Sequence, residues 1–314
     1  MRIVIIEYVF AGGLAGDPLE AALAPEAREM VLGLVDDINR TPGMEVAVAV
    51  QGAAAEEIPE ACRIESMPEE SMEAFWQRAA GSGDAVVPIA PETGGALERL
   101  TRLLLETRVP VLGSSPDAVA LAGSKYRTAR ALTAAGIPVV PTLRAISASV
   151  CLAGEWVSKP DDGCDCDGVR RVSGRVSKRI AEGHVLQPFM PGEPASLSLL
   201  CTADSARVLS CNQQMVEARG EHFSYRGSRV AAQAVQPVHQ WLASAVFDAI
   251  PGLYGFAGID FLVDGERLTV LEVNPRPTTS VVGLRQATGI GPGLLISELL
   301  RGARCNPRLG EGVA

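Results

Sequence analysis

Residues 258–277 read GIDFLVDGERLTVLEVNPRP and decide the fold of the chain. Two apolar runs flank Asp264-Gly265, a pair of residues typical of the turn between two strands. Polar Asp260, Glu272 and Asn274 interrupt these runs, and a carboxylate inside a strand is costly to bury unless it is paired or holds a cation. The segment therefore predicts a β-hairpin that carries a polar site.

The register of the hairpin decides whether its polar side chains share a face. Glu272 and Asn274 do so, because alternate residues of a strand point to the same side. Asp260 joins them if the loop has three residues, 264–266, whereas a two-residue loop sends it to the opposite face. We predict the three-residue loop and a site for Mg²⁺ or Mn²⁺, since oxygen ligands suit these ions better than zinc. The alternative is that both carboxylates are solvated and Asn274-Pro275 is only a turn.

Arg276 follows the hairpin and is flanked by Pro275 and Pro277, which hold its backbone rigidly. A guanidinium at this position can reach phosphate oxygens beside the metal, where charge develops during phosphoryl transfer. We predict Arg276 as a catalytic residue; the alternative is an ordinary surface salt bridge.

The chain has 314 residues, with 28 basic and 37 acidic side chains and a net charge of −9. This length suffices for two or three compact lobes, and the charge argues against a general nucleic-acid binder. Three of the basic residues are lysines: Lys125, Lys159 and Lys178. In a chain that otherwise uses arginine, we expect lysine at positions that need an ammonium group.

The remaining composition excludes several classes of protein. Seven cysteines, an odd and scattered number, favour reduced thiols in the cytoplasm over a disulfide framework. No apolar stretch approaches the roughly 18–20 residues that span a membrane, and the run 3–6 is too short for a signal peptide. Widely separated histidines and the lack of a G-x-S-x-G motif argue against a zinc protease or a serine hydrolase. We expect neither nucleic-acid nor membrane partners and leave a homodimer open.

Residues 1–112 alternate β-rich runs with amphipathic stretches. We predict strands at 2–6, 45–50, 85–89 and 109–112, and helices at 19–39, 67–80 and 92–106. This succession predicts a small doubly wound α/β domain. Ligands of such sheets bind beyond the carboxyl ends of the strands, which places Glu7 and Tyr8 on the binding rim. Equally, Glu7 simply ends a strand.

The pattern changes after residue 112 to that of an antiparallel α+β part. We predict a helix at 124–135 capped by Ser124, a helix at 238–250 and a last helix at 293–300. Short strands are predicted at 155–158, 168–172, 184–187, 196–202 and 208–213, followed by the hairpin 256–273. We divide this part into subdomains 113–183 and 184–302, with a loose tail at 303–314.

One of these strands ends at Lys159, and a loop bounded by Gly163 and Gly168 follows. Glycines at both ends let backbone N–H groups close over a polyphosphate, to which the lysine adds a point charge. Taken alone, the pattern fits a surface hairpin with a solvated lysine better. The loop also carries four aspartates and the pair Cys164/Cys166, which lacks further ligands at metal-binding spacing.

Together these segments resemble the ATP-grasp superfamily of carboxylate–amine ligases, from about Gly113 to Leu300. The motifs that carry the resemblance follow in the family's order: Gly113-Ser114-Ser115, Ser124-Lys125, residues 136–142 (GIPVVPT), Lys159-Pro160, residues 187–193 (QPFMPGE), and the Asp260 hairpin with Glu272-Val273-Asn274-Pro275-Arg276. The resemblance implies the ATP-grasp fold behind the N-terminal doubly wound domain.

It also implies a role for each matching residue. In the family, a substrate carboxylate attacks the γ-phosphate of ATP to give an acyl phosphate, which an amine opens to an amide. The implied roles are Lys125 at the ATP phosphates and in catalysis, Lys159 at the adenine and α-phosphate, Gly163 and Gly168 around the lid loop, Gln187 in the adenine hinge, Asp260, Glu272 and Asn274 as metal ligands, and Arg276 at the transferred phosphoryl group. Lys178 matches no motif.

Further motifs are similar to the tyramine–L-glutamate ligase family, which serves methanofuran-type cofactor biosynthesis. They are residues 5–13 (IIEYVFAGG), 212–214 (NQQ), 223–227 (FSYRG) and 278–280 (TTS). The resemblance implies that the γ-carboxylate of L-glutamate condenses with the amine of tyramine or a close relative.

Charge complementarity suggests which residues contact these substrates. Glu7 suits an ammonium group, Arg226 or Arg285 suits an α-carboxylate, and Tyr8 and Tyr225 accompany them. Two other functions stay open. A ligase for another amino-acid or dipeptide pair would share the nucleotide residues, and a non-catalytic nucleotide sensor would be favoured by a missing metal ligand or lysine.

Overall fold

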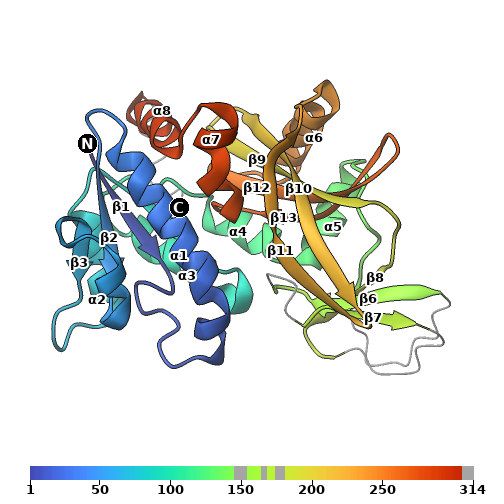
Figure 1. The fold of residues 1–314 in the computed structure, drawn as a ribbon, viewed down its shortest axis with the longest axis horizontal. Coiled ribbons are helices and arrows are strands. Elements are labelled where there is room, and N and C mark those ends of the chain that lie inside the picture. The colour runs from blue at the N-terminus through green and yellow to red at the C-terminus, as the bar shows by residue number, and fades with distance from the viewer. Residues whose placement is uncertain (145–153, 164–167, 174–180, 306–314) are drawn as a thin grey trace.

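The computed structural model describes residues 1–144, 154–163, 168–173 and 181–305. Two sheets organise them: a four-stranded parallel sheet at the N-terminal end, and a nine-stranded sheet whose paired strands are antiparallel (Figure 1). The predicted combination of a doubly wound α/β domain with an α+β part is confirmed.

The parallel sheet has the strand order β3-β2-β1-β4. Its strands are β1 (Arg2–Glu7), β2 (Glu45–Val50), β3 (Arg63–Glu65) and β4 (Ala85–Ile89), and its helices are α1 (Pro18–Asn39), α2 (Met72–Gly81) and α3 (Ala96–Leu105). Short 3-10 helices η1 (Gly52–Glu57), η2 (Glu60–Cys62) and η3 (Thr93–Gly95) connect them. Consecutive residues of β1 point to opposite faces: Ile3 and Ile5 pack on α1, whereas Val4 and Ile6 pack in the cluster of α2 and α3. Both faces are therefore buried, which explains the nearly unbroken apolar strands.

Three predicted elements differ from the structure. The run 109–112 forms no strand but an isolated parallel bridge between Val86 and Val111. The helix predicted from residue 67 begins at Met72, because the Ser71 side chain caps it by accepting the Ala74 N–H at 3.2 Å. The helix predicted from residue 92 begins at Ala96, since Gly94 and Gly95 adopt left-handed backbone conformations.

The second sheet has the strand order β13-β12-β9-β10-β11-β7-β6-β8-β5. Its strands are β5 (Leu143–Arg144), β6 (Glu155–Pro160), β7 (Arg170–Ser173), β8 (His184–Pro188), β9 (Glu193–Cys201), β10 (Ala206–Arg219), β11 (His222–Gln233), β12 (Gly255–Asp264) and β13 (Arg267–Asn274). The accompanying helices are α4 (Pro116–Ala122), α5 (Lys125–Ala134), α6 (Pro237–Ala249), η4 (Thr279–Gly283), α7 (Leu284–Thr288) and α8 (Pro292–Cys305).

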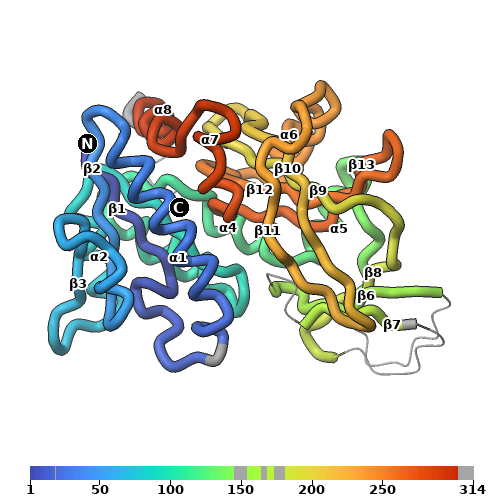
Figure 2. The backbone as a smooth tube through the Cα atoms, in the orientation of Figure 1, coloured from blue at the N-terminus to red at the C-terminus, as the bar shows by residue number. Residues whose placement is uncertain are grey.

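The sequence prediction contained neither β11 nor α4. β11 includes Gly227 and several polar residues, so its sequence is typical of a loop, although it forms a 12-residue strand paired with β10. This hairpin extends from the body of the sheet toward β6 and β7 (Figure 2), where His222 pairs with Arg170. It thereby joins the two groups of strands into one sheet.

The predicted subdomain boundaries stay a prediction, and two observations bear on them. β8 pairs with β5 and β6, so a boundary at residue 183 would separate it from its partner strands. At the C-terminal end α8 continues to Cys305, beyond the predicted start of the tail at residue 303. Leu295 and Ile296 of α8 lie in the same buried cluster as α1, beside which Figure 1 shows this helix. No helix in the described ranges combines the length and apolarity needed to cross a membrane.

The prediction of a three-residue loop in the β12–β13 hairpin is wrong, but the predicted placement of Asp260 and Glu272 on one face is confirmed. Asp264 pairs with Arg267, which leaves a two-residue turn with Gly265 at φ 60° in the first central position, where type II′ turns favour glycine. A β-bulge at Leu271 then restores the alternation, because Asp260 pairs with Glu272 while Phe261 pairs with Val270. The extra residue brings Asp260 and Glu272 to the same face.

Replacing Gly265 with alanine tests the cost of this turn. A Cβ there would meet no atom within 4 Å, so the substitution changes backbone conformational energy alone. We expect Gly265→Ala to lower the free energy of unfolding by about 1–2 kcal/mol, the cost of a left-handed conformation for an L-residue. Urea denaturation measures the change.

Gly81→Ala is the matched control for Gly265→Ala. Gly81 ends α2 with an ordinary helical conformation and also has open space around its Cα. Alanine there should raise the free energy of unfolding by up to about 1 kcal/mol. Equal effects of the two substitutions would contradict the assignment of the turn.

Candidate active site

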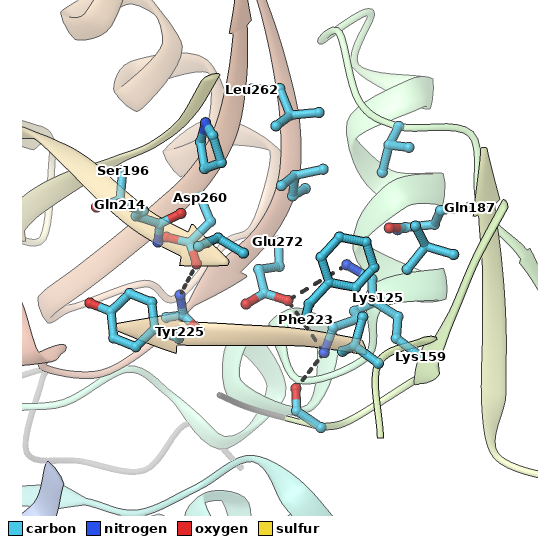
Figure 3. A pocket seen from close by; sticks show the side chains of 18 of the residues that line it. Lys125, Lys159, Gln187, Ser196, Gln214, Phe223, Tyr225, Asp260, Leu262 and Glu272 are labelled. Carbon is cyan, nitrogen blue, oxygen red and sulfur yellow. Dashed lines mark hydrogen bonds and ion pairs between the residues drawn. The ribbon is translucent and has the colours of Figure 1, made fainter. Parts of the chain in front are cut away.

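A cavity of about 400 Å³ opens between the β12–β13 hairpin, the β10–β11 hairpin and the strands β6 and β8. It brings together most of the site residues predicted from the sequence: Lys125, Lys159, Gly163, Gln187, Tyr225, Asp260, Glu272, Asn274 and Arg276. Figure 3 labels six of them: Lys125, Lys159, Gln187, Tyr225, Asp260 and Glu272. These residues span positions 125–276 of the chain, so tertiary folding brings the lysines and Gln187 to the hairpin that carries Asp260, Glu272 and Asn274.

Three oxygen-bearing side chains of the hairpin face the cavity. Asp260 and Glu272 are opposed across the two strands, and Asn274 Nδ2 donates to Asp260 Oδ2 at 3.5 Å. Burial, followed by the nearby Glu272 carboxylate, raises the pKa of Asp260 to about 7. A hard cation would relieve this cost, and two carboxylates with an amide oxygen are ligands that Mg²⁺ accepts.

This donor set does not fit a zinc site. The described ranges hold no group of three or more His, Cys, Asp and Glu side chains suited to a metal ion. The predicted pair Cys164/Cys166 lies outside the described residues, as do Asp165, Asp167 and Lys178. The residues present therefore favour the predicted Mg²⁺ or Mn²⁺ over zinc.

Two lysines face the hairpin from the other side of the cavity. Lys125 opens α5, and its Nζ lies 3.3 Å from Glu272 Oε2 and donates to the Gly163 carbonyl. Lys159 ends β6, with its Nζ 4.0 Å from the same carboxylate oxygen (Figure 3). Burial would raise the pKa of Glu272, but Lys125 and then Lys159 lower it below the ordinary value. The cavity thus holds two buried ammonium groups beside two carboxylates, a surface suited to a metal-bound polyphosphate.

The loop after Lys159 uses its first two aspartates to hold the protein together. Asp161 accepts from Ser124 Oγ at 2.7 Å and from the Tyr126 N–H at 2.8 Å, which fixes the start of α5. The Asp162 carboxylate accepts the Gly94 N–H at 2.8 Å, and its backbone carbonyl accepts from Thr93 Oγ1 at 3.0 Å. These two carboxylates therefore have structural partners within the protein.

Both predicted glycines of this loop pack against Pro160. A Cβ on Gly163 would lie 2.9 Å from the Pro160 ring, and one on Gly168 would lie 3.0 Å from it. Gly168 also has φ 68°, a conformation that favours glycine. Gly163 lines the cavity, and Val169 takes the place expected for Gly168.

The buried Gln187 side chain marks the adenine-hinge segment predicted from the sequence. Its Nε2 donates to Thr142 Oγ1 at 3.0 Å, which links β8 to the residue before β5. The neighbouring wall of the cavity is apolar and consists of Val140, Val157, Val169, Met190, Leu262 and Leu271. This apolar slot, with the polar Gln187 side chain beside it, is typical of a pocket for a small molecule.

Arg276 lines the cavity and is held by the N-terminal domain. Its Nε donates to Glu92 Oε1 at 3.0 Å and its Nη2 to Glu92 Oε2 at 3.2 Å. The two side chains are only 10% and 8% exposed, so the pair is buried and differs from the surface salt bridge considered as the alternative. Sequence spacing could not reveal it, because the partners are 184 residues apart.

Four other candidates do not line this cavity. Glu7 ends β1, accepts the Phe10 N–H at 2.9 Å and lines a separate cavity of about 30 Å³, and burial raises its pKa to about 7. Tyr8 packs on Trp76, with ring centroids 5.4 Å apart. Arg226 is exposed and pairs with Glu217.

The prediction that Arg285 meets a substrate carboxylate also needs correction. Its guanidinium forms two hydrogen bonds to Asp37 of α1, a carboxylate that additionally accepts the Gly293 N–H at 2.7 Å. Asp37 therefore ties both α7, through Arg285, and the start of α8, through Gly293, to the N-terminal domain.

A polar and aromatic wall, contributed largely by β11 and η4, contains the predicted Tyr225, while its residues Glu26 and Ser196 were not predicted from the sequence. Tyr225 Oη lies 2.8 Å from Ser228 Oγ and 3.4 Å from Thr279 Oγ1, and burial raises the pKa of Tyr225. Further lining residues are Glu26 of α1, Ser196, Gln214, Thr278, Ser280, and Phe223, which stacks on Phe189. The alternation of Phe223 and Tyr225, two residues apart, was the signal that could have revealed the strand.

Comparisons with known proteins agree with this architecture. A family model described as the ATP-grasp domain matches residues 122–280, and one described as the pre ATP-grasp 3 domain matches residues 45–119. A solved structure from Archaeoglobus fulgidus, described as that of an ATP-grasp superfamily protein, covers 95% of this chain and 88% of its own, with a TM-score of 0.73 and 23% identity. This likeness concerns the fold.

Two curated relatives are tyramine–L-glutamate ligases of Methanocaldococcus jannaschii and Methanocaldococcus fervens. The chain is 28% identical to the first over 209 residues and 29% identical to the second over 202 residues, in each case 64% of this chain. These matches span 58% and 62% of the relatives, less than two thirds of their length.

Proposed function

The chain belongs to the ATP-grasp domain family, and from this premise we propose that it is an ATP-dependent ligase that joins a carboxylate to an amine. The observation that carries the proposal is the single cavity in which Lys125 and Lys159 face Glu272, opposite Asp260 and Asn274. The ammonium groups can neutralise phosphate oxygens during transfer, and the carboxylates with the Asn274 amide can hold the metal ion of a metal-bound triphosphate.

The proposed reaction has two balanced steps. A carboxylate oxygen of the acid bonds to the γ-phosphorus of ATP while the bond to the β–γ bridging oxygen breaks, which gives an acyl phosphate and ADP. The amine nitrogen then bonds to the acyl carbon, phosphate leaves and the amine loses a proton. The protein contributes positioning and charge neutralisation to both steps.

We assign roles by position in the cavity. Lys125 and Lys159 contact the phosphates, Gln187 and the apolar slot hold the adenine, and Arg276 stabilises the transferred phosphoryl group. Asp260, Glu272 and Asn274 would hold Mg²⁺ or Mn²⁺. When bound, this ion would supply positive charge that neutralises the phosphate oxygens.

We propose L-glutamate, through its γ-carboxylate, and tyramine or a close relative as the substrates. The resemblance to tyramine–L-glutamate ligases supports this pair. The wall of Tyr225, Phe223 and Glu26 supports it chemically, because it offers aromatic surface and a carboxylate within the same cavity. Free, buried thiols at Cys62, Cys201 and Cys211 support a cytoplasmic location.

Release of ADP over a panel of acids and amines tests this proposal. We expect ADP and an amide product, identified by mass spectrometry, with L-glutamate and tyramine, and with the α-methyl ester of glutamate. L-Glutamine should give none, because it lacks the γ-carboxylate, and omission of the amine should abolish amide formation.

The other outcomes decide between the alternatives. An amide formed from a different amino-acid pair, with none from tyramine, would replace the substrates but keep the ligase. ATP binding without amide formation from any pair would instead favour a nucleotide sensor.

A further inference from the structure

The N-terminal sheet presents its binding crevice to Arg276. In the order β3-β2-β1-β4, strands β2 and β3 are added on one side of β1 and β4 on its other side, so the strand order switches between β1 and β4. Ligands of doubly wound sheets bind beyond the carboxyl ends of the strands at such a switch point. Glu7 ends β1 and Glu92 follows β4 by three residues. Arg276, from the end of β13, enters this crevice, where it lines the small cavity together with Glu7.

Glu92 fixes the plane of the Arg276 guanidinium. Two hydrogen bonds, from Nε and Nη2, run to the two oxygens of one carboxylate, and a two-bond contact sets direction as well as distance. Pro275 and Pro277 restrain the backbone of the arginine but not its long side chain. Glu92 itself is buried against Gly123, whose Cβ position lies 3.3 Å from the Glu92 Cβ.

The two residues after Glu92 contact the loop that lines the cavity at Gly163. Thr93 Oγ1 and the Gly94 N–H both donate to Asp162, at 3.0 and 2.8 Å. Asp162 directly precedes Gly163, whose carbonyl accepts from Lys125 Nζ. One short segment, residues 92–94, therefore contacts both the arginine and the loop that meets the phosphate-binding lysine.

We propose that Glu92 is a positioning residue for phosphoryl transfer, through which the N-terminal domain aligns Arg276 with the transferred group. This inference rests on the proposed function. It requires that Glu92 act on the rate of the reaction through the orientation of Arg276, beyond its contribution to the contact between the domains.

The chain offers a matched control for this distinction. Asp37 and Arg285 form a second pair with two hydrogen bonds between the N-terminal domain and the segment after the hairpin. Asp37 is 8% exposed, like Glu92, yet neither Asp37 nor Arg285 lines the cavity. Asp37→Asn and Glu92→Gln thus make the same chemical change in two ion pairs whose carboxylates are equally buried, although Arg285 is 39% exposed and Arg276 only 10%.

Steady-state kinetics of both variants with the wild-type protein's best acid–amine pair test the proposal. We expect Glu92→Gln to lower kcat about 100-fold, the effect of a misplaced catalytic group, with little change in KM for ATP. Asp37→Asn should lower the temperature of thermal unfolding but keep kcat near that of the wild type. Glu92→Asp, which keeps the charge but shortens its reach, should show an intermediate kcat.

Wild-type kcat in Glu92→Gln, or an equal loss of kcat in Asp37→Asn, would overturn the inference while leaving the ligase function intact. If Glu92→Gln does not fold, Glu92→Asp decides: a reduced kcat at an unchanged unfolding temperature supports the inference, and an unchanged kcat overturns it. A wild-type protein that releases no ADP with any pair would overturn the proposed function and, with it, this inference.

Discussion

Glu272→Gln is expected to lower the rate of ADP release about a thousandfold. Glu272 lies opposite Asp260 and within 4.0 Å of the Lys125 and Lys159 ammonium groups, so it contacts both the proposed metal site and the phosphate-binding lysines. Metal-ion neutralisation of developing charge contributes several kcal/mol to such a reaction, which corresponds to roughly three powers of ten in rate. Gln keeps the shape of the side chain but removes its charge.

The loss should come from weaker engagement of the metal-bound nucleotide. Titration calorimetry with ATP and Mg²⁺ should show reduced affinity in Glu272→Gln, whereas titration with ATP in the presence of a chelator should give similar affinities for variant and wild type. Glu266→Gln, an exposed residue in the turn of the same hairpin, serves as the control and should behave as wild type. A Glu272→Gln protein that retained most of the wild-type rate would contradict both the metal site and the ligase mechanism.

Arg276→Met is expected to lower kcat by about three powers of ten, the lower end of the effect of an arginine that stabilises a transferred phosphoryl group. Arg276→Lys should recover little of this loss, because an ammonium group cannot form the two-bond contact that Glu92 makes with the guanidinium. Single-turnover measurements at saturating ATP separate this effect on chemistry from an effect on nucleotide binding.

Stability must be separated from catalysis in this experiment. Removing one partner of a buried ion pair leaves the other unpaired and destabilises a protein by about 3–5 kcal/mol. The double substitution Arg276→Met with Glu92→Gln removes both charges, so we expect it to recover stability but not kcat. Arg207→Met, which removes an exposed arginine paired with Glu298, controls for loss of positive charge. Recovery of kcat in the double variant would show that Arg276 acts only as a structural contact.

The hairpin shows how far local sequence rules extend. The turn residues Asp264-Gly265 and the apolar runs around them correctly predict two paired strands with Asp260 and Glu272 on one face. They do not predict whether a three-residue loop or a β-bulge brings Asp260 to this face, because both restore the same alternation of side chains. Leu271, the extra residue of the bulge, lines the cavity. The pairing of β12 with β9 and β13 favours the bulge over the three-residue loop.

The candidate substrate residues show the opposite limit. Charge alone led to the prediction that Arg226 or Arg285 contacts a substrate α-carboxylate, but each pairs with a carboxylate of the protein outside the cavity. Glu26 is not among the predicted site residues, although α1 places it at the cavity wall. Charge type is readable from the sequence, but the position of a charged side chain on an assembled surface is not.

The sequence by itself determined the elements with strong local signals. Periodic apolar residues, caps such as Ser124, and turn glycines predict most strands and helices because each depends on neighbours within a few residues. The ordered motifs around Lys125, Lys159 and the hairpin further predict candidate nucleotide-binding residues, which line one cavity in the structure.

Only the tertiary structure decided which distant groups meet. It joined β8 to β5 and β6, packed α8 on α1, and selected Glu92 from 37 acidic residues as the partner of Arg276. The physical reason is that an ion pair between domains depends on the relative placement of two separately folded sheets. That placement follows from the packing of whole buried surfaces, which no local periodicity encodes.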